Sequence, residues 1–128
     1  QTILITGAAS GLGRSLALRF SRRKANLVLW DLSKDGLEET RRQCALMGNK
    51  GVVRYEESPP KVGTTFSDGF PVNNARVQFG PVDMLINNAG IGVGAKFVNM
   101  QERDVRRLME VNALSHYWKM FTLLHTCQ

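Results

Sequence analysis

The sequence of 128 residues predicts an α/β fold, built as an incomplete doubly wound parallel sheet of about four strands. Short apolar runs without polar alternation occur at four places, as expected for parallel strands that are buried on both faces. Stretches with helical periodicity separate these runs. A glycine-rich turn joins the first run to the first helical stretch, and it carries most of the functional information.

The first strand is expected at residues 2–6, and the helix that follows it at residues 11–24. Between them, Gly7 allows a tight turn with positive φ. Gly11 allows the main chain to approach a pyrophosphate, and Gly13 allows the helix to lie close to the strand. Free N–H groups and the helix dipole favour an anion at this N-terminus. The turn therefore predicts a dinucleotide phosphate site.

Two further residues of the turn, Ser10 and Leu12, are predicted to contribute to this cofactor site. Leu12 also begins an apolar series that continues with Leu16 and Phe20 at helical spacing. This spacing predicts that the three side chains form the buried face of the helix.

The second strand is expected at residues 26–31, and it ends in Asp31. A carboxylate about twenty residues after the glycine turn is the expected partner of an adenosine ribose 2′-OH. The same carboxylate would repel a 2′-phosphate, which favours NAD over NADP as the cofactor. Arg14 and Lys34 are nearby cations, so this preference is not absolute.

The next helix is predicted over residues 34–47, with Ser33 as its N-cap and Gly48 as its stop. The third strand has two possible positions, one at residues 51–55 and the other near residues 61–66. The sequence leaves both open.

The fourth strand is predicted at residues 82–86, and Asn88, Ala89 and Gly90 follow it directly. Ligands bind at the carboxyl ends of the strands in open parallel sheets. Small residues there leave room for a ribose, and the Asn88 amide can both donate and accept hydrogen bonds. These three residues are therefore predicted to contact the cofactor, although a turn that only ties neighbouring strands together would use the same residues.

A last helix is predicted from about residue 101 to residue 125, because this segment has no Pro or Gly. Asn99 and Glu102 have the spacing of a capping box at its start. Asn112 is expected on the face that meets the sheet. The apolar residues of that face are Val105, Leu108 and Met109.

The chain is basic, with 17 Lys and Arg against 11 Asp and Glu and a formal charge of +6. Arg103, Arg106 and Arg107 are expected on the solvated face of the last helix, in preference to a site for an anionic membrane surface. No aromatic residues interleave with the charges, which argues against a nucleic-acid partner. Cys44 and Cys127 do not suggest a disulfide framework. Together with the two histidines, the cysteines lack the spacing of metal ligands, so no metal is expected.

Three separated motifs together resemble the short-chain dehydrogenase/reductase family. They are Gly-x-x-x-Gly-x-Gly at residues 7–13, Asn-Asn-Ala-Gly at residues 87–90, and Val-Asn at residues 111–112. The segments Val28–Asp31, Gly36–Thr40 and Val111–Trp118 resemble its retinol dehydrogenase and 17β-hydroxysteroid dehydrogenase branch. The resemblance implies a Rossmann-like domain over residues 1–128, with the strand order 3-2-1-4.

The resemblance also implies an NAD-dependent oxidoreductase that acts on lipophilic alcohols or ketones of retinoid or steroid type. Of the catalytic group of this family, only Asn112 has a counterpart, and the Ser and the Tyr-x-x-x-Lys pair belong to segments beyond residue 128. Tyr117 does not replace that tyrosine, because Phe121 stands where Lys is required. The alternative is a catalytically inactive truncated form that binds a nucleotide or a partner subunit.

Further expectations follow from the resemblance. The family has an acid that contacts adenine after its third strand. Glu56 or Glu57 would take this place with the first strand position, and the place falls near Thr65 with the second. A homodimer, association with a membrane surface, and a location at the endoplasmic reticulum or lipid droplets are implied, with a cytoplasmic location as the alternative. Because the chain begins at Gln1, a segment before it is expected, and such a segment carries a hydrophobic anchor in many relatives.

Overall fold

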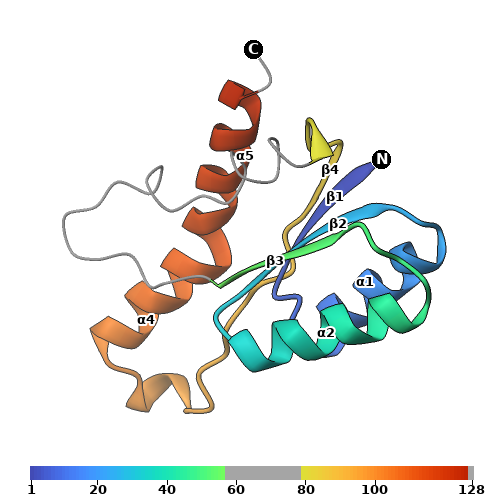
Figure 1. Ribbon diagram of the computed structural model, residues 1–128. Coiled ribbons are helices and arrows are strands. Elements are labelled where there is room, and N and C mark those ends of the chain that lie inside the picture. The colour runs from blue at the N-terminus through green and yellow to red at the C-terminus, as the bar shows by residue number, and fades with distance from the viewer. Residues whose placement is uncertain (57–78, 127–128) are drawn as a thin grey trace.

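The computed structural model describes residues 1–56 and 79–126, and it contains one parallel four-stranded sheet (Figure 1). The strands are β1 (Thr2–Thr6), β2 (Asn26–Asp31), β3 (Val52–Glu56) and β4 (Met84–Ile86). Their order in the sheet is β3-β2-β1-β4, which is the order that the family resemblance implies. Ile5 aligns with Leu29 on one side and with Ile86 on the other, so β1 is central.

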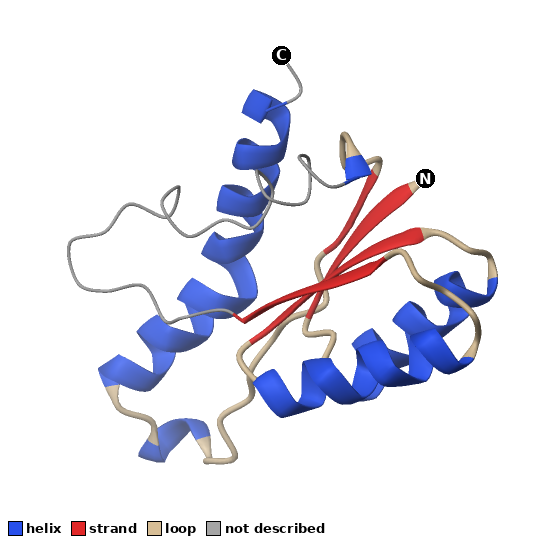
Figure 2. Ribbon diagram, in the orientation of Figure 1, coloured by secondary structure: helices blue, strands red, loops and turns tan. Residues whose placement is uncertain are grey.

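Helices cover both faces of this sheet (Figure 2). The helices α1 (Gly11–Arg22) and α2 (Lys34–Leu46) lie side by side on one face. On the other face, α4 (Glu102–Met109) continues through a π-helical turn, η3 (Glu110–Leu114), into α5 (Ser115–Thr126). A short 3-10 turn, η2 (Phe97–Asn99), precedes α4. Within the described residues, no helix is both long enough and apolar enough to cross a membrane.

The alternation of side chains along β1 and β2 divides the core into two layers. Ile3, Ile5, Leu27 and Leu29 are fully buried against α1 and α2. Leu4, Val28 and Trp30 point to the other face, where Leu123 of α5 packs against them. Both faces of the central strands are therefore buried, which explains why their sequences are apolar throughout.

The buried face of α1 differs from the predicted one. Gly13, Ala17 and Ser21 are its buried residues, whereas the Leu12 side chain is 66% exposed. Leu16 and Phe20 are partly buried against the core, as expected. Small residues at every fourth position let α1 lie close to the strands, and this rotation turns Leu12 toward solvent. The prediction of a buried Leu12 is therefore wrong.

The helix α2 begins and ends as the sequence predicts. The Ser33 side chain accepts a hydrogen bond from the Gly36 N–H at 3.2 Å, and Gly48 has a φ of +74° just beyond the helix. The strand β3 confirms the first of the two possible positions, residues 51–55, within one residue. The second position, near residues 61–66, lies outside the described residues, as do Glu57 and Thr65.

The predicted capping pair of the last helix is wrong. Asn99 ends the 3-10 turn, and the helix begins three residues later. Its first turn is closed by Asp104, whose carboxylate accepts the Gln101 N–H at 3.0 Å. The 3-10 turn includes Asn99, so the N-cap of the helix is Gln101, two residues later than predicted.

Candidate functional site

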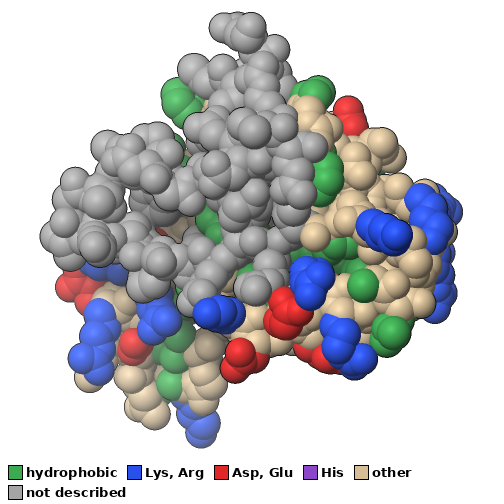
Figure 3. Space-filling view, in the orientation of Figure 1, with side chains coloured by type: hydrophobic (Ala, Val, Ile, Leu, Met, Phe, Trp, Pro, Cys, Tyr) green, Lys and Arg blue, Asp and Glu red, His purple; other side chains and the backbone are tan. Residues whose placement is uncertain are grey.

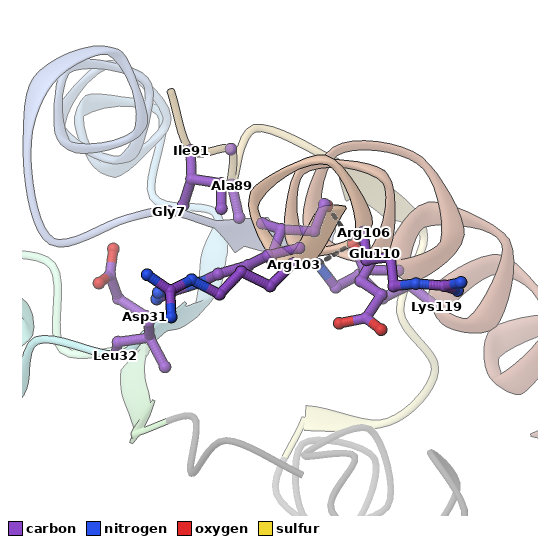
Figure 4. Close-up of a pocket in the computed structure, with 13 residues that line it drawn as sticks. Gly7, Asp31, Leu32, Ala89, Ile91, Arg103, Arg106, Glu110 and Lys119 are labelled. Atoms are coloured by element: carbon purple, nitrogen blue, oxygen red, sulfur yellow. Dashed lines mark hydrogen bonds between the residues drawn. The ribbon is translucent and has the colours of Figure 1, made fainter. Parts of the chain in front are cut away.

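A cavity of about 570 Å³ lies at the carboxyl ends of β1, β2 and β4, between these ends and the α4–α5 segment (Figure 4). The sheet contributes Gly7, Asp31, Leu32, Ala89, Gly90 and Ile91 to its lining. The helical segment contributes Arg103, Arg106, Arg107, Glu110, Val111, Ser115 and Lys119. This is the edge of an open parallel sheet where ligands bind, and the volume suits a small molecule.

Asp31 stands at the wall of this cavity, and backbone donors fix both of its carboxylate oxygens. Oδ2 accepts the Ala9 N–H at 3.0 Å, and Oδ1 accepts the Ser33 N–H at 3.0 Å. The first of these bonds joins the glycine-rich turn to the end of β2. Because a carboxylate has about four acceptor positions, it can still accept hydrogen bonds from a ligand hydroxyl.

The glycine-rich turn has the local geometry that its residue types predict. Gly7 and Gly11 have φ values of +66° and +50°. A Cβ on Gly11 would meet no atom within 4 Å, so the main chain there is open to a ligand. A Cβ on Gly13 would lie 2.1 Å from the Gly7 carbonyl oxygen, so only glycine lets α1 approach the turn. The turn therefore fits the pyrophosphate of a dinucleotide.

Eight of the nine predicted cofactor residues divide into two groups. Gly7, Asp31, Ala89 and Gly90 line the cavity. Ser10, Gly11, Leu12 and Gly13 belong to the turn at the start of α1 and lie outside the lining. Ser10 is the N-cap of α1, in extended conformation, and its side chain makes no capping hydrogen bond. A dinucleotide in contact with both groups would span the cavity and the turn.

Arg14 supports the turn from behind. Its guanidinium donates to the Ala9 and Gly36 carbonyls and, at 3.0 Å, to the Thr40 hydroxyl. Thr40 in turn donates to the Ala8 carbonyl at 2.9 Å. These bonds tie the turn to α2 and occupy this arginine with structural contacts.

Asn88 ties the ends of β1 and β4 together. Its Nδ2 donates to the Thr6 and Gly7 carbonyls at 3.0 and 3.2 Å. The Thr6 hydroxyl accepts the N–H groups of Asn88 and Ala89 at 3.1 and 2.9 Å. Asn88 does not line the cavity, so contact with a cofactor stays a prediction for this residue.

Asn112 lies in the π-helical turn and makes a two-way pair with the main chain of Ile91. Its Oδ1 accepts the Ile91 N–H at 2.8 Å, and its Nδ2 donates to the Ile91 carbonyl at 2.9 Å. The pair anchors the helix to the loop after β4. The apolar face that was expected beside Asn112 is not buried, because Val105 and Met109 are 40% and 56% exposed. That expectation is wrong.

Sequence reasoning missed the helical wall of the cavity. Arg103 and Arg107 were expected on a solvated face, and Ser115 and Lys119 were not singled out. These four residues and Val111 recur at every fourth position, and all five line the cavity. These five residues form a stripe along the α4–α5 segment. Their spacing is visible in the sequence, but only the fold shows that the stripe faces the cavity.

Lys119 is the most buried charged residue of this wall, with 2% exposure. Its Nζ donates to the Ser115 hydroxyl at 3.3 Å and lies 5.1 Å from the centroid of the Trp30 ring. A cation over an aromatic face is stabilised by the ring quadrupole.

No three His, Cys, Asp or Glu side chains in the described part of the chain could together hold a metal ion.

The family model for short chain dehydrogenase matches residues 1–127. The chain is 35% identical to 17-beta-hydroxysteroid dehydrogenase 13 of Rattus norvegicus, over 97% of this chain and 40% of that protein. It is 37% identical to epidermal retinol dehydrogenase 2 of Homo sapiens, over 92% of this chain and 37% of that protein. The chain therefore spans about two fifths of the length of these curated relatives.

Solved structures agree with these relationships. A short-chain dehydrogenase/reductase from Brucella melitensis matches with a TM-score of 0.82 and 28% identity, over 97% of this chain and 49% of that one. A metagenomic short-chain oxidoreductase in complex with NADP matches with a TM-score of 0.81 and 23% identity, over 95% and 54%. The second likeness shows the fold alone. The chain belongs to the short-chain dehydrogenase family of oxidoreductases, which use nicotinamide cofactors, and it corresponds to the N-terminal half of such an enzyme.

Proposed function

We propose that this chain binds NAD and forms the cofactor-binding half of a dehydrogenase. One observation carries the proposal: the Asp31 carboxylate lies in the cavity wall and is held there by the Ala9 N–H of the glycine-rich turn. This hydrogen bond joins an open main chain for the pyrophosphate to an acceptor for a ribose hydroxyl. The negative charge of Asp31 disfavours a 2′-phosphate, which supports NAD over NADP.

The residues of this chain bind and orient the cofactor, and they do not accept the proton that the alcohol releases. NAD, when bound, supplies a hydride acceptor at its nicotinamide. The proton of the alcohol requires a general base, which in this family is the tyrosine of a Tyr-x-x-x-Lys pair. The two tyrosines of the chain, Tyr55 and Tyr117, are followed four residues later by Pro59 and Phe121. Asn112 has no tyrosine and lysine here with which to complete a relay.

The substrate class is proposed from the relatives. Those with 35% and 37% identity are named for hydroxysteroid and retinol dehydrogenation. The complete protein is therefore proposed to oxidise a lipophilic alcohol or reduce the matching ketone. For residues 1–128 alone we propose nucleotide binding without turnover, because general acid–base catalysis contributes about 10²–10⁴-fold and its group is absent.

Two assembly proposals accompany this function. The α5 residues Tyr117, Trp118 and Phe121 are 68%, 43% and 54% exposed, which favours a homodimer through this helix. A formal charge of +6 favours contact with an anionic membrane surface, and the endoplasmic reticulum or lipid droplets are the proposed location.

Calorimetry tests the cofactor proposal. We expect the chain to bind NAD more tightly than NADP, and Asp31→Ala to narrow the difference. Asp35→Ala removes the same charge from an exposed position in the first turn of α2, and it should leave the ratio unchanged. Equal affinities for NAD and NADP in the unmodified chain would overturn the proposal.

A turnover assay tests the catalytic proposal separately. With NAD and retinol or a 17-hydroxysteroid, NADH formation should not exceed that of a control without protein. Formation clearly above the control would show that the chain supplies its own general base.

A further inference from the structure

The cavity carries more positive than negative charge, although its expected ligand contact is a ribose. Among the described residues that line it, four are cations, and two carboxylates, Asp31 and Glu110, oppose them. The pyrophosphate does not account for this surplus, because it belongs at the start of α1, and Ser10, Gly11, Leu12 and Gly13 lie outside the lining. The surplus comes instead from side chains of α4 and α5, on the wall that faces the end of β2, where the adenosine ribose is expected.

The cations come from the wall opposite Asp31. Figure 4 shows Asp31 and Leu32 on one side of the cavity, and Arg106, Glu110 and Lys119 on the other. Figure 3 shows a group of Lys and Arg side chains at the lower left, over α4. The cavity therefore has an acidic wall at the end of β2 and a basic wall on α4 and α5.

The α4 arginines can exchange their present partners for a ligand. Arg103 is 80% exposed, and its Nε lies 3.9 Å from Asp104 Oδ1. Within the described residues, Arg107 makes no ion pair. Arg106 is paired more closely, at 2.6 Å, with Glu102. Exposed ion pairs of this kind contribute little, and a phosphate accepts the planar guanidinium fork in two hydrogen bonds.

We infer that Arg103 and Arg107 form a subsite for a phosphate group on the adenosine ribose of a dinucleotide. The two residues lie one helical turn apart on the stripe that lines the cavity, so both guanidinium groups can reach one phosphate. This inference rests on the proposed function, since it assumes that the adenosine end occupies the cavity. Asp31 and the arginines then act in opposite directions, and the discrimination against a 2′-phosphate is smaller than Asp31 alone would produce.

The test compares two probes that differ by one phosphate, 5′-AMP and adenosine 2′,5′-bisphosphate, by calorimetry on the whole chain. The variant is Arg103→Gln with Arg107→Gln. The matched control is Arg19→Gln with Arg22→Gln, which removes the same charge from exposed positions near the far end of α1. We expect the bisphosphate to bind about tenfold more weakly to the variant, because each charged hydrogen bond is worth about that factor or more when it is made fully. Binding of 5′-AMP should change by less than about twofold, and the control should change neither.

A second measurement needs no substitution. In the unmodified chain, the affinity for the bisphosphate should fall more steeply with added salt than the affinity for 5′-AMP, because exposed charges are screened. Equal salt slopes for the two probes would overturn the inference. So would a variant in which both probes weaken equally, since that result indicates only the general field of the chain. If neither probe binds the unmodified chain, the proposed function itself fails, and this outcome is distinct from the others.

Discussion

Gly13→Ala tests how closely α1 lies against the glycine-rich turn. The added Cβ would lie 2.1 Å from the Gly7 carbonyl oxygen and 2.7 Å from Asn88 Nδ2. Since Cβ atoms do not approach other atoms closer than 3.0 Å, the helix or the turn must move by about 1 Å. Overpacking of this kind typically costs about 1–3 kcal/mol. The movement also weakens the two bonds from Asn88 to the Thr6 and Gly7 carbonyls, at about 1 kcal/mol each.

The gain in helix propensity on replacing glycine by alanine is at most about 1 kcal/mol, so it offsets only part of this cost. The net expectation is a loss of about 2–4 kcal/mol in the free energy of unfolding. For a chain of this length, that loss lowers the midpoint of thermal unfolding by roughly 10 °C, which far-UV circular dichroism measures.

Gly11→Ala is the matched control, because its Cβ would meet no atom within 4 Å. Its φ of +50° costs an alanine only about 1 kcal/mol, so its midpoint should fall less than that of Gly13→Ala. If Gly13→Ala unfolds at the midpoint of the unmodified chain, α1 does not lie as close to the turn as described, and the reasoning fails.

Three further predictions concern other parts of the fold. The Cys44 side chain is fully buried, and burial raises the pKa of its thiol. In the Cys127→Ser variant, Cys44 should therefore react with iodoacetamide roughly a hundredfold more slowly in the folded chain than in the chain unfolded by urea. Equal reaction rates in the two states would contradict a folded core. Asn112→Ala removes both hydrogen bonds to the Ile91 main chain, which lie at an exposed position. It should lower the free energy of unfolding by about 1 kcal/mol, as measured by urea denaturation. An unchanged urea midpoint would show that Asn112 does not anchor the helix to the loop after β4. The exposed aromatic face of α5 should make the chain associate, so light scattering across a dilution series should show a mass that rises with concentration; a monomer at high concentration would contradict this.

The strands of the central sheet could be predicted because burial on both faces leaves an unambiguous sequence. Leu4 and Leu27 occupy opposite layers, yet both positions must be apolar. The order of the strands needed the resemblance as well, because a sequence of apolar runs does not show which strands are neighbours. The two positions for the third strand illustrate this limit, since both have suitable composition and only the pairing of β3 with β2 decides between them.

The local geometry of the candidate site was predicted where a few neighbouring residues determine it, and it was missed where tertiary packing determines it. The role of a glycine with positive φ, or of a carboxylate at a strand end, can be predicted from the few residues around it, as Gly7 and Asp31 show. The exposure of Leu12 depends on how α1 is rotated on the sheet, and helical periodicity alone does not fix that rotation. The position of Lys119 over Trp30 joins residues 89 positions apart, so no local pattern could reveal it.

We propose that NAD binds across the glycine-rich turn and the cavity beside Asp31. Titration of NAD into isotope-labelled chain, followed by amide NMR spectra, tests it most directly. We predict that the largest shifts occur at Ala9, Gly11, Asp31 and Gly90, and that the amide of Arg22, at the far end of α1, stays unchanged. Shifts confined to other regions, or no shifts at millimolar NAD, would show that NAD does not bind at this site.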